Sequence, residues 1–468
     1  MNEISKHTGN RKIILIAISL SSFLTAFSAY TTVISAKSIE IDLGMDVVTI
    51  SWVTNIFILA TAMFQIFFGK IGDVYGRKKV FLAGIILFLI SSILLALTYM
   101  SNIFIIFRFI QGIGTALMFS TTNAILTANF PPNERGKVIG INVMCVYIGL
   151  TLSPLLGGLM TQYLGWRSQF WFNIPFSIIV ICLILFKVDG EWKNEKREKI
   201  DYFGSIIFAL FLFFLIYATT LFPNVIAYIL LILSGIGITI FLFWEKRVNN
   251  PLLDLNLFRS NRYFSFSCMV SIFYYLSTNA IALVLSLLMQ YLYNLTIFNA
   301  GIILSIAPLM QAVFSPIIGR LSDKMESRKL VSIGIIISLM GISILIFINY
   351  SFPIYLVFLS LGILGLGTAF FSPPNIRAIM SSTPTENLGI ASGLEGTTRT
   401  IGQSLSFGLW TLMTGIIIGN VEITPIYYPQ VMISARLIFI IYLILILFSL
   451  FFSVFRGRNR IEDYNIKK

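Results

Sequence analysis

Apolar runs of about 20 residues recur along the chain, and they exclude nearly every soluble fold. A helix of this length crosses about 30 Å of hydrocarbon, where backbone polar groups must be satisfied within the segment. Charged residues make up only 11% of the 468, against roughly 25% in soluble domains. The sequence predicts an all-α integral membrane protein with fourteen transmembrane helices, at residues 13–36, 50–69, 79–98, 103–125, 137–160, 169–187, 201–220, 225–244, 265–289, 299–318, 330–349, 353–374, 391–417 and 434–455.

Most lysines and arginines fall in the tails and in loops on one side of these spans, among them 70–79, 187–200, 245–264 and 319–329. Because basic loops stay in the cytoplasm, we expect a multi-pass plasma-membrane protein with both termini cytoplasmic. This asymmetry accounts for the net charge of +13 without a nucleic-acid partner. The sequence has no GxxxxGK[ST] phosphate loop, so no nucleotide is expected to drive transport.

Side chains that bind metals or act as catalysts are scarce in the spans. The single histidine, His7, lies in the amino-terminal tail, and Cys145, Cys182 and Cys268 lie within apolar runs. An enzyme would need a convergent nucleophile, acid–base pair or metal cluster. We therefore expect no cofactor, no metal and no enzymatic activity; a receptor or scaffold without transport is a further alternative.

A charged segment occurs twice: Gly69–Lys79 (GKIGDVYGRKK) recurs as Gly319–Lys329 (GRLSDKMESRK). Each copy follows one apolar run and precedes another, and the copies are eight spans apart. A six-helix repeat offset by eight implies two inserted helices, and equal sidedness makes the repeats parallel. We predict a six-helix bundle at 1–200, an inserted pair at 201–249, and a second six-helix bundle with its tail at 250–468.

Each copy of this segment carries an aspartate at a helix end. Such a carboxylate can pair with cations and with exposed amides at a neighbouring helix amino terminus, which would latch one conformational state. Glycines permit the tight turn and close backbone approach. The predicted gating loop consists of Gly69, Asp73, Gly76, Arg77, Gly319, Asp323 and Arg328. The alternative is a solvated anchoring loop, and Glu326 in place of Gly76 predicts that the second copy is the weaker latch.

Two spans carry residues that membrane crossing alone does not require. Arg108 lies within the fourth span, where an arginine costs about 2.5–3.5 kcal/mol on insertion scales, so it must face the bundle interior. In the fifth span Gly149, Ser153 and Gly157 form one small-residue face that allows close helix approach, and Pro154 is expected to bend the helix. The alternatives are a structural arginine and ordinary close packing.

Glu395 and Arg399 are spaced i, i+4 in the thirteenth span, in the order that favours a helix ion pair. One interpretation is a shallow structural pair. In the other, Glu395 is functional, because it is the one carboxylate in the spans clear of the extreme helix ends.

Four segments together resemble the major facilitator superfamily, specifically its fourteen-helix drug:proton antiporter branch, over essentially the whole chain. They are Gly69–Lys79, Arg108–Gly114, Gly149–Gly158 and Gly389–Gln403. The resemblance implies that the charged loop controls the outward-to-inward switch and that Arg108 acts in proton coupling. It also implies that the fifth-span signature, Gly158 included, favours export over import.

The chain departs from the pattern of this branch at Ser28, where an aspartate is usual in the first helix. Since serine cannot titrate near neutral pH, the proton carrier is Glu395, Asp73 or another end carboxylate, or the coupling differs. Few carboxylates in the spans also suit a lipophilic, neutral, weakly cationic or anionic amphiphile. We expect the substrate cavity to be lined by Ser28, Thr31, Thr32, Asn55, Gln111, Gln290 and Gln311.

The sequence therefore predicts a secondary transporter that exports lipophilic or amphipathic, drug-type small molecules by alternating access. Its expected partners are the lipid bilayer, the substrate and protons, with proton coupling assigned to Arg108, Glu395 and Arg399. The alternative is an exporter or facilitator of one endogenous metabolite, peptide or lipid-like molecule without proton coupling.

Overall fold

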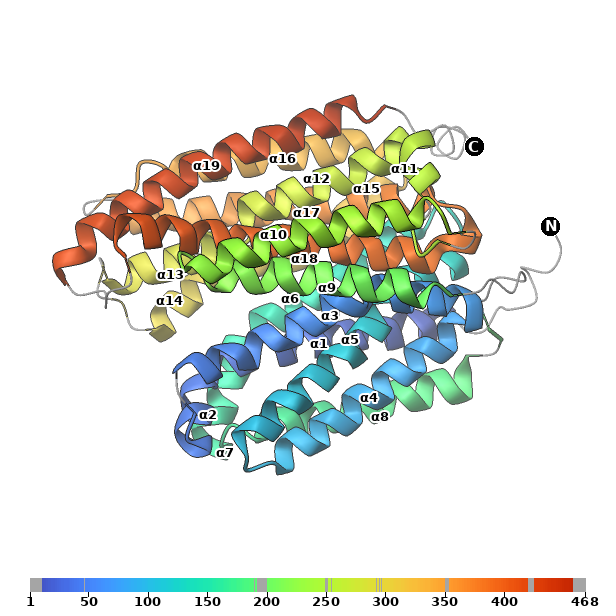
Figure 1. Cartoon of the computed structure of the whole chain (residues 1–468), viewed down its shortest axis with the longest axis horizontal. Coiled ribbons are helices and arrows are strands. Elements are labelled where there is room, and N and C mark those ends of the chain that lie inside the picture. Colours follow the sequence, from blue (N-terminus) through green and yellow to red (C-terminus); the bar gives the residue numbers. More distant parts are fainter. Residues whose placement is uncertain are drawn as a thin grey trace. The chain divides into compact units, whose positions relative to one another are not determined.

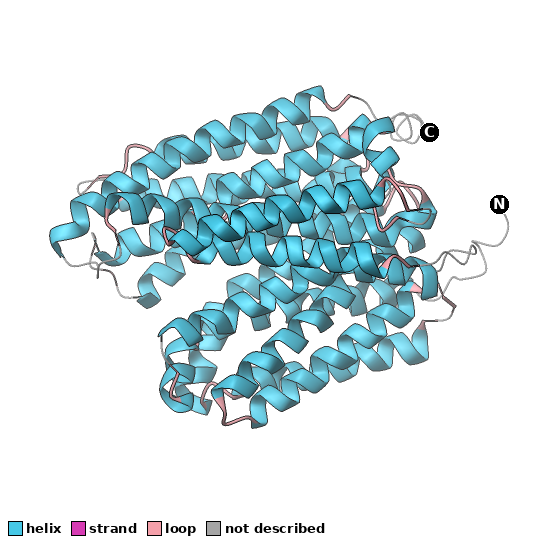
Figure 2. Cartoon of the chain, viewed as in Figure 1, coloured by secondary structure: helices cyan, strands magenta, loops and turns pink. Residues whose placement is uncertain are grey.

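Every regular element in the described part of the chain is a helix (Figure 1, Figure 2), so the predicted all-α class is confirmed. The computed structural model describes residues 11–45, 47–188, 190–191, 200–248, 251–253, 255–291, 293, 295, 297–349, 353–419 and 425–457.

The chain forms two compact units. Unit 1 comprises residues 1–200 together with 315–324 and 383–396, and unit 2 comprises the remaining residues. Two short segments from late in the chain therefore belong with the first 200 residues. They come from the end of α15 (Ile306–Ser322) and from the start of α18 (Leu388–Ile417) with the turn before it.

The other helices of unit 1 are α1 (Arg11–Ile34), α2 (Ala36–Leu43), α3 (Val47–Tyr75), α4 (Arg77–Leu97), α5 (Ser101–Asn129), α6 (Arg135–Leu152), α7 (Gly158–Leu164) and α8 (Ser168–Lys187). Those of unit 2 are α9 (Tyr202–Thr220), α10 (Val225–Glu245), α11 (Leu255–Ser260), α12 (Arg262–Thr278), α13 (Ile281–Tyr291), α14 (Ile297–Leu304), α16 (Ser327–Leu345), α17 (Ile354–Ser381) and α19 (Tyr428–Phe455).

Among the described residues, 13 helical segments are long and apolar enough to cross a membrane. They correspond to all but one of the predicted spans. The remaining one, 391–417, is α18, which has 30 residues and is long enough. Its composition is more polar because it contains Glu395, Arg399 and many glycine, serine and threonine residues.

Matching glycine contacts occur at corresponding points of the two repeats. In unit 1 a Cβ added to Gly84 of α4 would lie 2.8 Å from the carbonyl oxygen of Gly114 of α5. In unit 2 a Cβ on Gly334 of α16 would lie 2.7 Å from the carbonyl oxygen of Gly367 of α17. Both helix pairs therefore pack backbone against backbone, which only glycine allows.

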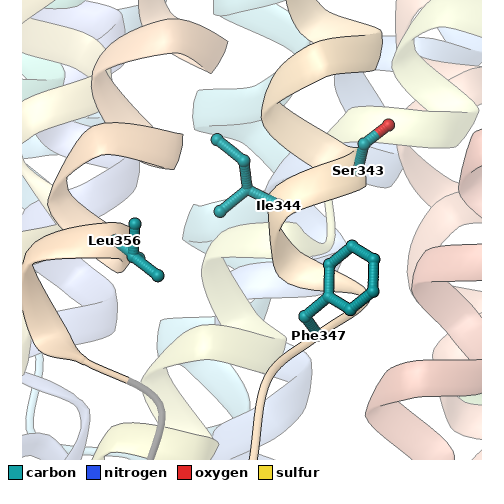
Figure 3. Close-up of a pocket in the computed structure, with 4 residues that line it drawn as sticks. All are labelled: Ser343, Ile344, Phe347 and Leu356. Atoms are coloured by element: carbon teal, nitrogen blue, oxygen red, sulfur yellow. The ribbon is translucent and has the colours of Figure 1, made fainter.

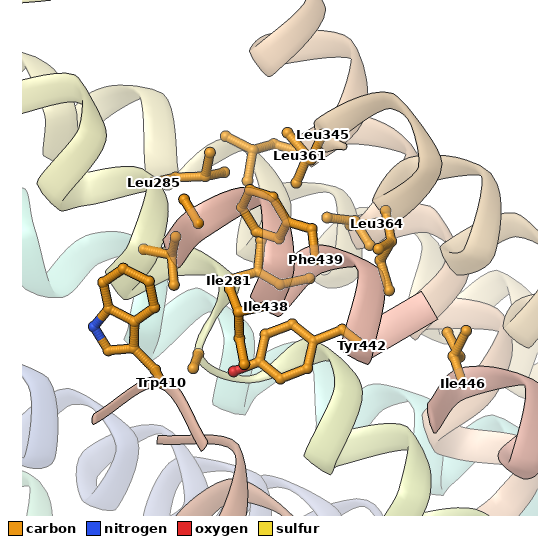
Figure 4. Packing of buried hydrophobic residues seen from close by; sticks show 14 of the residues in the cluster. Ile281, Leu285, Leu345, Leu361, Leu364, Trp410, Ile438, Phe439, Tyr442 and Ile446 are labelled. Atoms are coloured by element: carbon orange, nitrogen blue, oxygen red, sulfur yellow. The ribbon is translucent and has the colours of Figure 1, made fainter. Parts of the chain in front are cut away.

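An apolar core fills the centre of unit 2 (Figure 4). Tyr442 of α19 is fully buried within it, and its hydroxyl donates to the carbonyl oxygen of Ser406 at 2.8 Å. The predicted inserted helices α9 and α10 lie side by side in this unit (Figure 1). Ser234 of α10 donates to the carbonyl oxygen of Phe211 of α9 at 3.3 Å.

Candidate functional site

The segment expected to form a loop at 70–79 is almost entirely helical. Helix α3 continues to Tyr75 and α4 begins at Arg77, so only Gly76 separates them. Gly76 has a φ of 118°, a conformation that favours glycine. The expected loop is therefore a corner between two helices, and Asp73 lies on the last turn of α3.

Asp73 caps the amino terminus of a helix far away in sequence. Its carboxylate accepts hydrogen bonds from the amide of Gly389 at 2.8 Å and from the amide of Ile390 at 3.0 Å. These amides lie in the first turn of α18, where no intrahelical acceptor is available. Asp73 is 2% exposed, so water does not compete for these bonds, and the positive end of the helix dipole stabilises its charge.

Arg77 completes this cap. Its guanidinium contacts Asp73 Oδ1 through Nε at 2.9 Å and through Nη2 at 2.7 Å. Nη2 also donates to the carbonyl oxygen of Thr385 at 2.8 Å. Arg77 is itself buried, so it links the carboxylate of Asp73 to the turn that precedes α18.

Glycines bring α3 and α18 close enough for this cap to form. A Cβ on Gly69 would overlap the carbonyl oxygen of Gly389, and a Cβ on Gly389 would lie 2.6 Å from Asp73 Oδ1. One turn further on, a Cβ on Gly393 would lie 2.5 Å from the carbonyl oxygen of Gln65. Side chains at these positions would push the two helices apart and remove the carboxylate from the amides.

Asp323 makes the same arrangement in the second copy. Its carboxylate accepts from the amides of Gly136 at 2.7 Å and Lys137 at 2.9 Å, in the first turn of α6. A Cβ on Gly319 would overlap the carbonyl oxygen of Gly136, and a Cβ on Gly140 would lie 2.5 Å from that of Ser315. Both copies thus use a glycine four residues before the aspartate and a GxxxG pair on the receiving helix.

The two copies differ around the carboxylate. Arg77 corresponds to Ser327 in the second copy. There Arg328 instead contacts Glu326, with Nε 3.3 Å from Oε1. Asp323 is half-buried where Asp73 is buried. That the second copy is the weaker latch stays a prediction, and these differences agree with it.

Glu191, after α8, is a further carboxylate at this corner that the sequence did not single out. Its Oε1 accepts from the amide of Lys78 at 2.7 Å, in the first turn of α4. Lys78 Nζ donates in turn to the carbonyl oxygen of Val188. A Cβ on Gly76 would lie 2.7 Å from Glu191 Oε1. The carboxylate therefore occupies the space that a side chain at Gly76 would need, whereas the second copy carries its own glutamate, Glu326, at that position.

Arg108 is fully buried in α5 and bonds to neutral groups. Nε donates to the carbonyl oxygen of Val53 at 3.1 Å, and Nη1 donates to Gln111 Oε1 at 2.7 Å. The guanidinium carbon lies 4.6 Å from the ring centroid of Phe57, and Gln111 continues to Ser92 Oγ at 2.9 Å. In the described part of the chain no carboxylate contacts Arg108 and its Nη2 has no hydrogen-bond partner. These contacts agree with the structural alternative, and the role of Arg108 in proton coupling stays a prediction.

The small-residue face of α6 packs against α1. A Cβ on Gly149 would lie 2.7 Å from the carbonyl oxygen of Phe23, and a Cβ on Gly157 would lie 2.7 Å from Thr31 Cγ2. Between them, Ser153 donates to the carbonyl oxygen of Gly149 at 2.6 Å. In place of a simple bend at Pro154, residues Ser153–Gly157 form a π-helical turn. Gly158 has open space around it, so it does not belong to this contact face.

Ser28 is buried between α1 and α8. Its hydroxyl accepts from Asn173 Nδ2 at 3.2 Å. Asn173 was not singled out from the sequence, although a buried asparagine in an apolar span is a signal for such a pair. The hydroxyls of Thr31 and Thr32 bond to carbonyl oxygens of their own helix.

The other residues expected to line the cavity each make contacts within their own unit. Gln111 belongs to the Arg108 network, and Gln290 and Gln311 each donate to a carbonyl oxygen four residues earlier; Asn55 is a partly buried residue of α3. A hollow of about 400 Å³ is lined by Ser343, Ile344, Phe347 and Leu356 (Figure 3). None of the residues expected in the cavity is among these four.

Glu395 is 3% exposed and accepts from Asn123 Nδ2 of α5 at 3.4 Å. Both residues belong to unit 1, whereas Arg399 belongs to unit 2. The expected pair of Glu395 with Arg399 therefore stays a prediction. Nothing in the sequence singled out Asn123, since its contact with Glu395 joins residues 272 positions apart.

Solved transporter structures share the fold. The human organic anion transporter MFSD10 (TETRAN) superposes with a TM-score of 0.68 at 13% identity, over 95% of this chain and 99% of that one. A double-tryptophan mutant of XylE superposes with a TM-score of 0.70 at 14% identity, over 97% and 98%. At these identities the likeness concerns the fold alone.

Sequence comparison adds relatives named as transporters. Riboflavin transporter RibZ of Clostridioides difficile (strain 630) is 29% identical over 85% of this chain and 86% of its own. Multidrug resistance protein Stp of Mycobacterium tuberculosis (strain CDC 1551 / Oshkosh) is 30% identical over 84% and 74%. Multidrug export protein EmrB of Escherichia coli (strain K12) is 29% identical over 85% and 80%.

The family model of the Major Facilitator Superfamily matches residues 18–244 and 267–468. The match covers most of both predicted repeats and agrees with the helical fold and its structural neighbours. The chain is a multi-pass membrane transporter of small molecules, and it belongs to the Major Facilitator Superfamily.

Proposed function

We propose that this transporter exports lipophilic or amphipathic small molecules across the plasma membrane by alternating access, in exchange for protons. The two repeats that move against each other are residues 1–200 and 250–468, with residues 201–249 inserted between them. Both termini lie in the cytoplasm.

The observation that carries this proposal is the reciprocal capping by Asp73 and Asp323. Asp73 of the first repeat caps α18 of the second, and Asp323 of the second repeat caps α6 of the first. These bonds form only while the capped helix ends meet, at the end that the basic loops assign to the cytoplasm. They therefore favour the state closed on that side and must break when it opens.

The size of this bias suits a switch. A hydrogen bond to a charged group contributes about 1.5–3 kcal/mol, and two conformations of a transporter differ by a few kcal/mol. Two amide bonds to each of two carboxylates are enough to hold one state. Binding of substrate or of the coupling ion then needs to offset only part of that preference.

The substrate class is proposed from composition and from the relatives. Stp and EmrB are named for multidrug resistance and export. The spans of this chain hold few carboxylates and many aromatic residues, which suits uncharged or weakly charged apolar molecules. Packing of Gly149 and Gly157 against α1 gives those helices a smooth surface along which to shift.

Proton coupling is proposed to use Glu395, because Ser28 cannot titrate near neutral pH. Glu395 is buried and lies next to the cap that Asp73 makes on α18. A proton on Glu395 would therefore act on the helix whose amino terminus the latch holds. Arg399, one turn further along α18, would adjust the affinity for the proton through its charge.

A second candidate is the export of one polar metabolite. It is favoured by the buried, uncharged pair of Ser28 and Asn173, which can bond to a neutral polar molecule. The similarity to a protein named riboflavin transporter also supports it.

The test uses inside-out membrane vesicles with ethidium and acriflavine as fluorescent probes and riboflavin as the polar probe. We expect ethidium or acriflavine to accumulate when the vesicle interior is acidic and to leave when a protonophore collapses the gradient. Accumulation of riboflavin alone would replace the first candidate with the second. Probe movement that ignores the gradient would refute proton exchange.

A further inference from the structure

Three buried polar side chains from three helices lie at the second turn of α18. They are Gln65 of α3, Asn123 of α5 and Glu395 of α18, which are 1%, 6% and 3% exposed. Asn123 Nδ2 donates to Glu395 Oε2 at 3.4 Å. The carboxamide of Gln65 lies against Gly396, where an added Cβ would be 2.5 Å from Gln65 Oε1.

Neighbouring contacts hold these side chains in place. Ser392 Oγ donates to the carbonyl oxygen of Phe119 at 3.0 Å, which ties α18 to α5. Gly393 packs against the carbonyl oxygen of Gln65, which ties α18 to α3. The backbone positions of Gln65, Asn123 and Glu395 therefore do not depend on their own side-chain bonds.

Two acceptors in this group lack a hydrogen-bond donor. Within the described part of the chain, neither Asn123 Oδ1 nor Gln65 Oε1 has a hydrogen-bond partner. Buried polar atoms are almost always bonded, because leaving one unpaired destabilises the fold. Two unpaired oxygens at the helical turn that carries Glu395 indicate a ligand that brings hydrogen or positive charge.

A proton fits this group better than a metal ion. An ionised carboxylate only accepts hydrogen bonds, whereas a protonated carboxyl group also donates one through O–H, which an unpaired amide oxygen can accept. Hard metal cations take six or more oxygen ligands. Among the described residues no group of three or more side chains suited to a metal is present, and one carboxylate oxygen of Glu395 already faces the N–H of Asn123.

We infer that Glu395 binds the coupling proton, that Asn123 stabilises its ionised form, and that Gln65 accepts the O–H of its protonated form. This inference rests on the proposed proton-driven export. When the proton leaves, the O–H bond to Gln65 is lost and Asn123 Nδ2 faces the full negative charge. The two amides thus respond to opposite states of one carboxyl group.

The charged residues on the elements around Glu395 are few. Helix α3 carries Lys70 and Asp73, and Asp73 is bonded to Arg77. On α18 itself, Arg399 follows one turn later. The only charged residue of α5 is Arg108, 15 positions from Asn123 and so about 22 Å away along the helix.

The experiment is an infrared titration of the purified full-length protein in lipid nanodiscs, without substrate. It follows the carboxylic-acid carbonyl band in wild type, Glu395→Gln, Asn123→Leu and Gln65→Leu. The control is Gln169→Leu, which removes another buried amide, from α8.

We expect Glu395→Gln to lose the titrating band. Asn123→Leu should raise the pH at the midpoint of the band's titration by about one unit relative to wild type, a tenfold change. Gln65→Leu should lower this midpoint by a similar amount. Gln169→Leu should leave it in place.

A band that persists in Glu395→Gln would overturn the inference, as would shifts of the same sign in Asn123→Leu and Gln65→Leu. A midpoint that moves when sodium chloride replaces choline chloride would assign the group to sodium instead. The titration needs no transport. The band could therefore be lost in Glu395→Gln although the wild type shows no gradient-driven export of ethidium. In that case the proton site stands and only the proposed function is refuted.

Discussion

The carboxylate of Asp73 accepts a hydrogen bond at 2.8 Å from the amide of Gly389, a residue 316 positions later in the chain. Asp323 relates to Gly136 in the same way, at 2.7 Å, but in the opposite chain direction. Amides in the first turn of a helix form an anion site, and here a carboxylate of the other repeat fills it. One duplicated segment thus supplies two caps.

Asp73→Asn is expected to lower the turnover of ethidium export about tenfold while changing its KM by less than about twofold. The amide keeps the volume but loses the charge that strengthens both hydrogen bonds, so the closed state becomes less populated. Initial rates in inside-out vesicles measure this. Asp201→Asn is the matched control, since Asp201 also accepts a helix-start amide, that of Gly204, but within the inserted helix pair. Equal turnover in wild type and Asp73→Asn would show that Asp73 does not act as a latch.

Gly157→Ala and Gly158→Ala form a matched pair of substitutions. The added methyl at Gly157 would lie 2.7 Å from Thr31 Cγ2, whereas the one at Gly158 meets open space. Overpacking a tight contact costs about 1–3 kcal/mol. Thermal unfolding in detergent should therefore show a clear loss of stability for Gly157→Ala and almost none for Gly158→Ala. If both behave alike, the contact between α6 and α1 is not as tight as described.

The helices and the duplication followed from the sequence because they depend on local composition. Runs of apolar residues and a repeated charged segment are visible without any tertiary contact, and the major facilitator fold confirmed what they implied. The expected loop at 70–79 was wrong in form, since the helices continue almost to Gly76. Helix ends are decided by the partners of the last amides and carbonyls, and those partners are distant in the chain.

The partners of the predicted site residues could not be read in advance. Asp73 was expected to find amides at a helix start, but nothing local marks Gly389 as the recipient. Asn123 and Glu191 were missed for the same reason: each bonds to a residue more than a hundred positions away. Asn173 could have been noticed, because a buried asparagine needs a hydrogen-bond partner.

Glu191→Gln is expected to lower turnover about threefold to tenfold, less than Asp73→Asn, because it weakens the cap on α4 rather than the contact between repeats. Gly76→Ala should act in the same direction and more strongly, since its methyl group would displace Glu191 and its φ of 118° is strained for alanine. Ethidium export measures both. Full activity in Gly76→Ala with Glu191 intact would contradict the arrangement.

Asp42 should give the protein an acid-dependent loss of stability. Arg167 donates a hydrogen bond to it at 2.6 Å, which holds the pKa of Asp42 below its usual value. Trp166 donates to the same oxygen. A lowered folded-state pKa contributes stability above the unfolded value of about 3.9, and that stability is lost as pH falls through the folded value.

The comparison is the melting temperature of wild type against Asp42→Asn across that range. Since the side chain of Asp42 is 46% exposed, the advantage of wild type at neutral pH should be at most about 1 kcal/mol. It should vanish at the acid end. A difference that grows on acidification has the wrong sign for this pair.

The most direct measurement of the central claim is the accessibility of a cysteine placed at Ser392, in a background without Cys145, Cys182 and Cys268. Ser392 is 1% exposed and lies two residues after Ile390, the second residue whose amide Asp73 caps. Inside-out vesicles expose the cytoplasmic side to a membrane-impermeant maleimide. If the caps hold that side closed, labelling is slow in the Ser392→Cys protein and several-fold faster when Asp73→Asn or Asp323→Asn is added, whereas Asp201→Asn leaves it slow. Labelling at one rate in all four proteins would contradict the account.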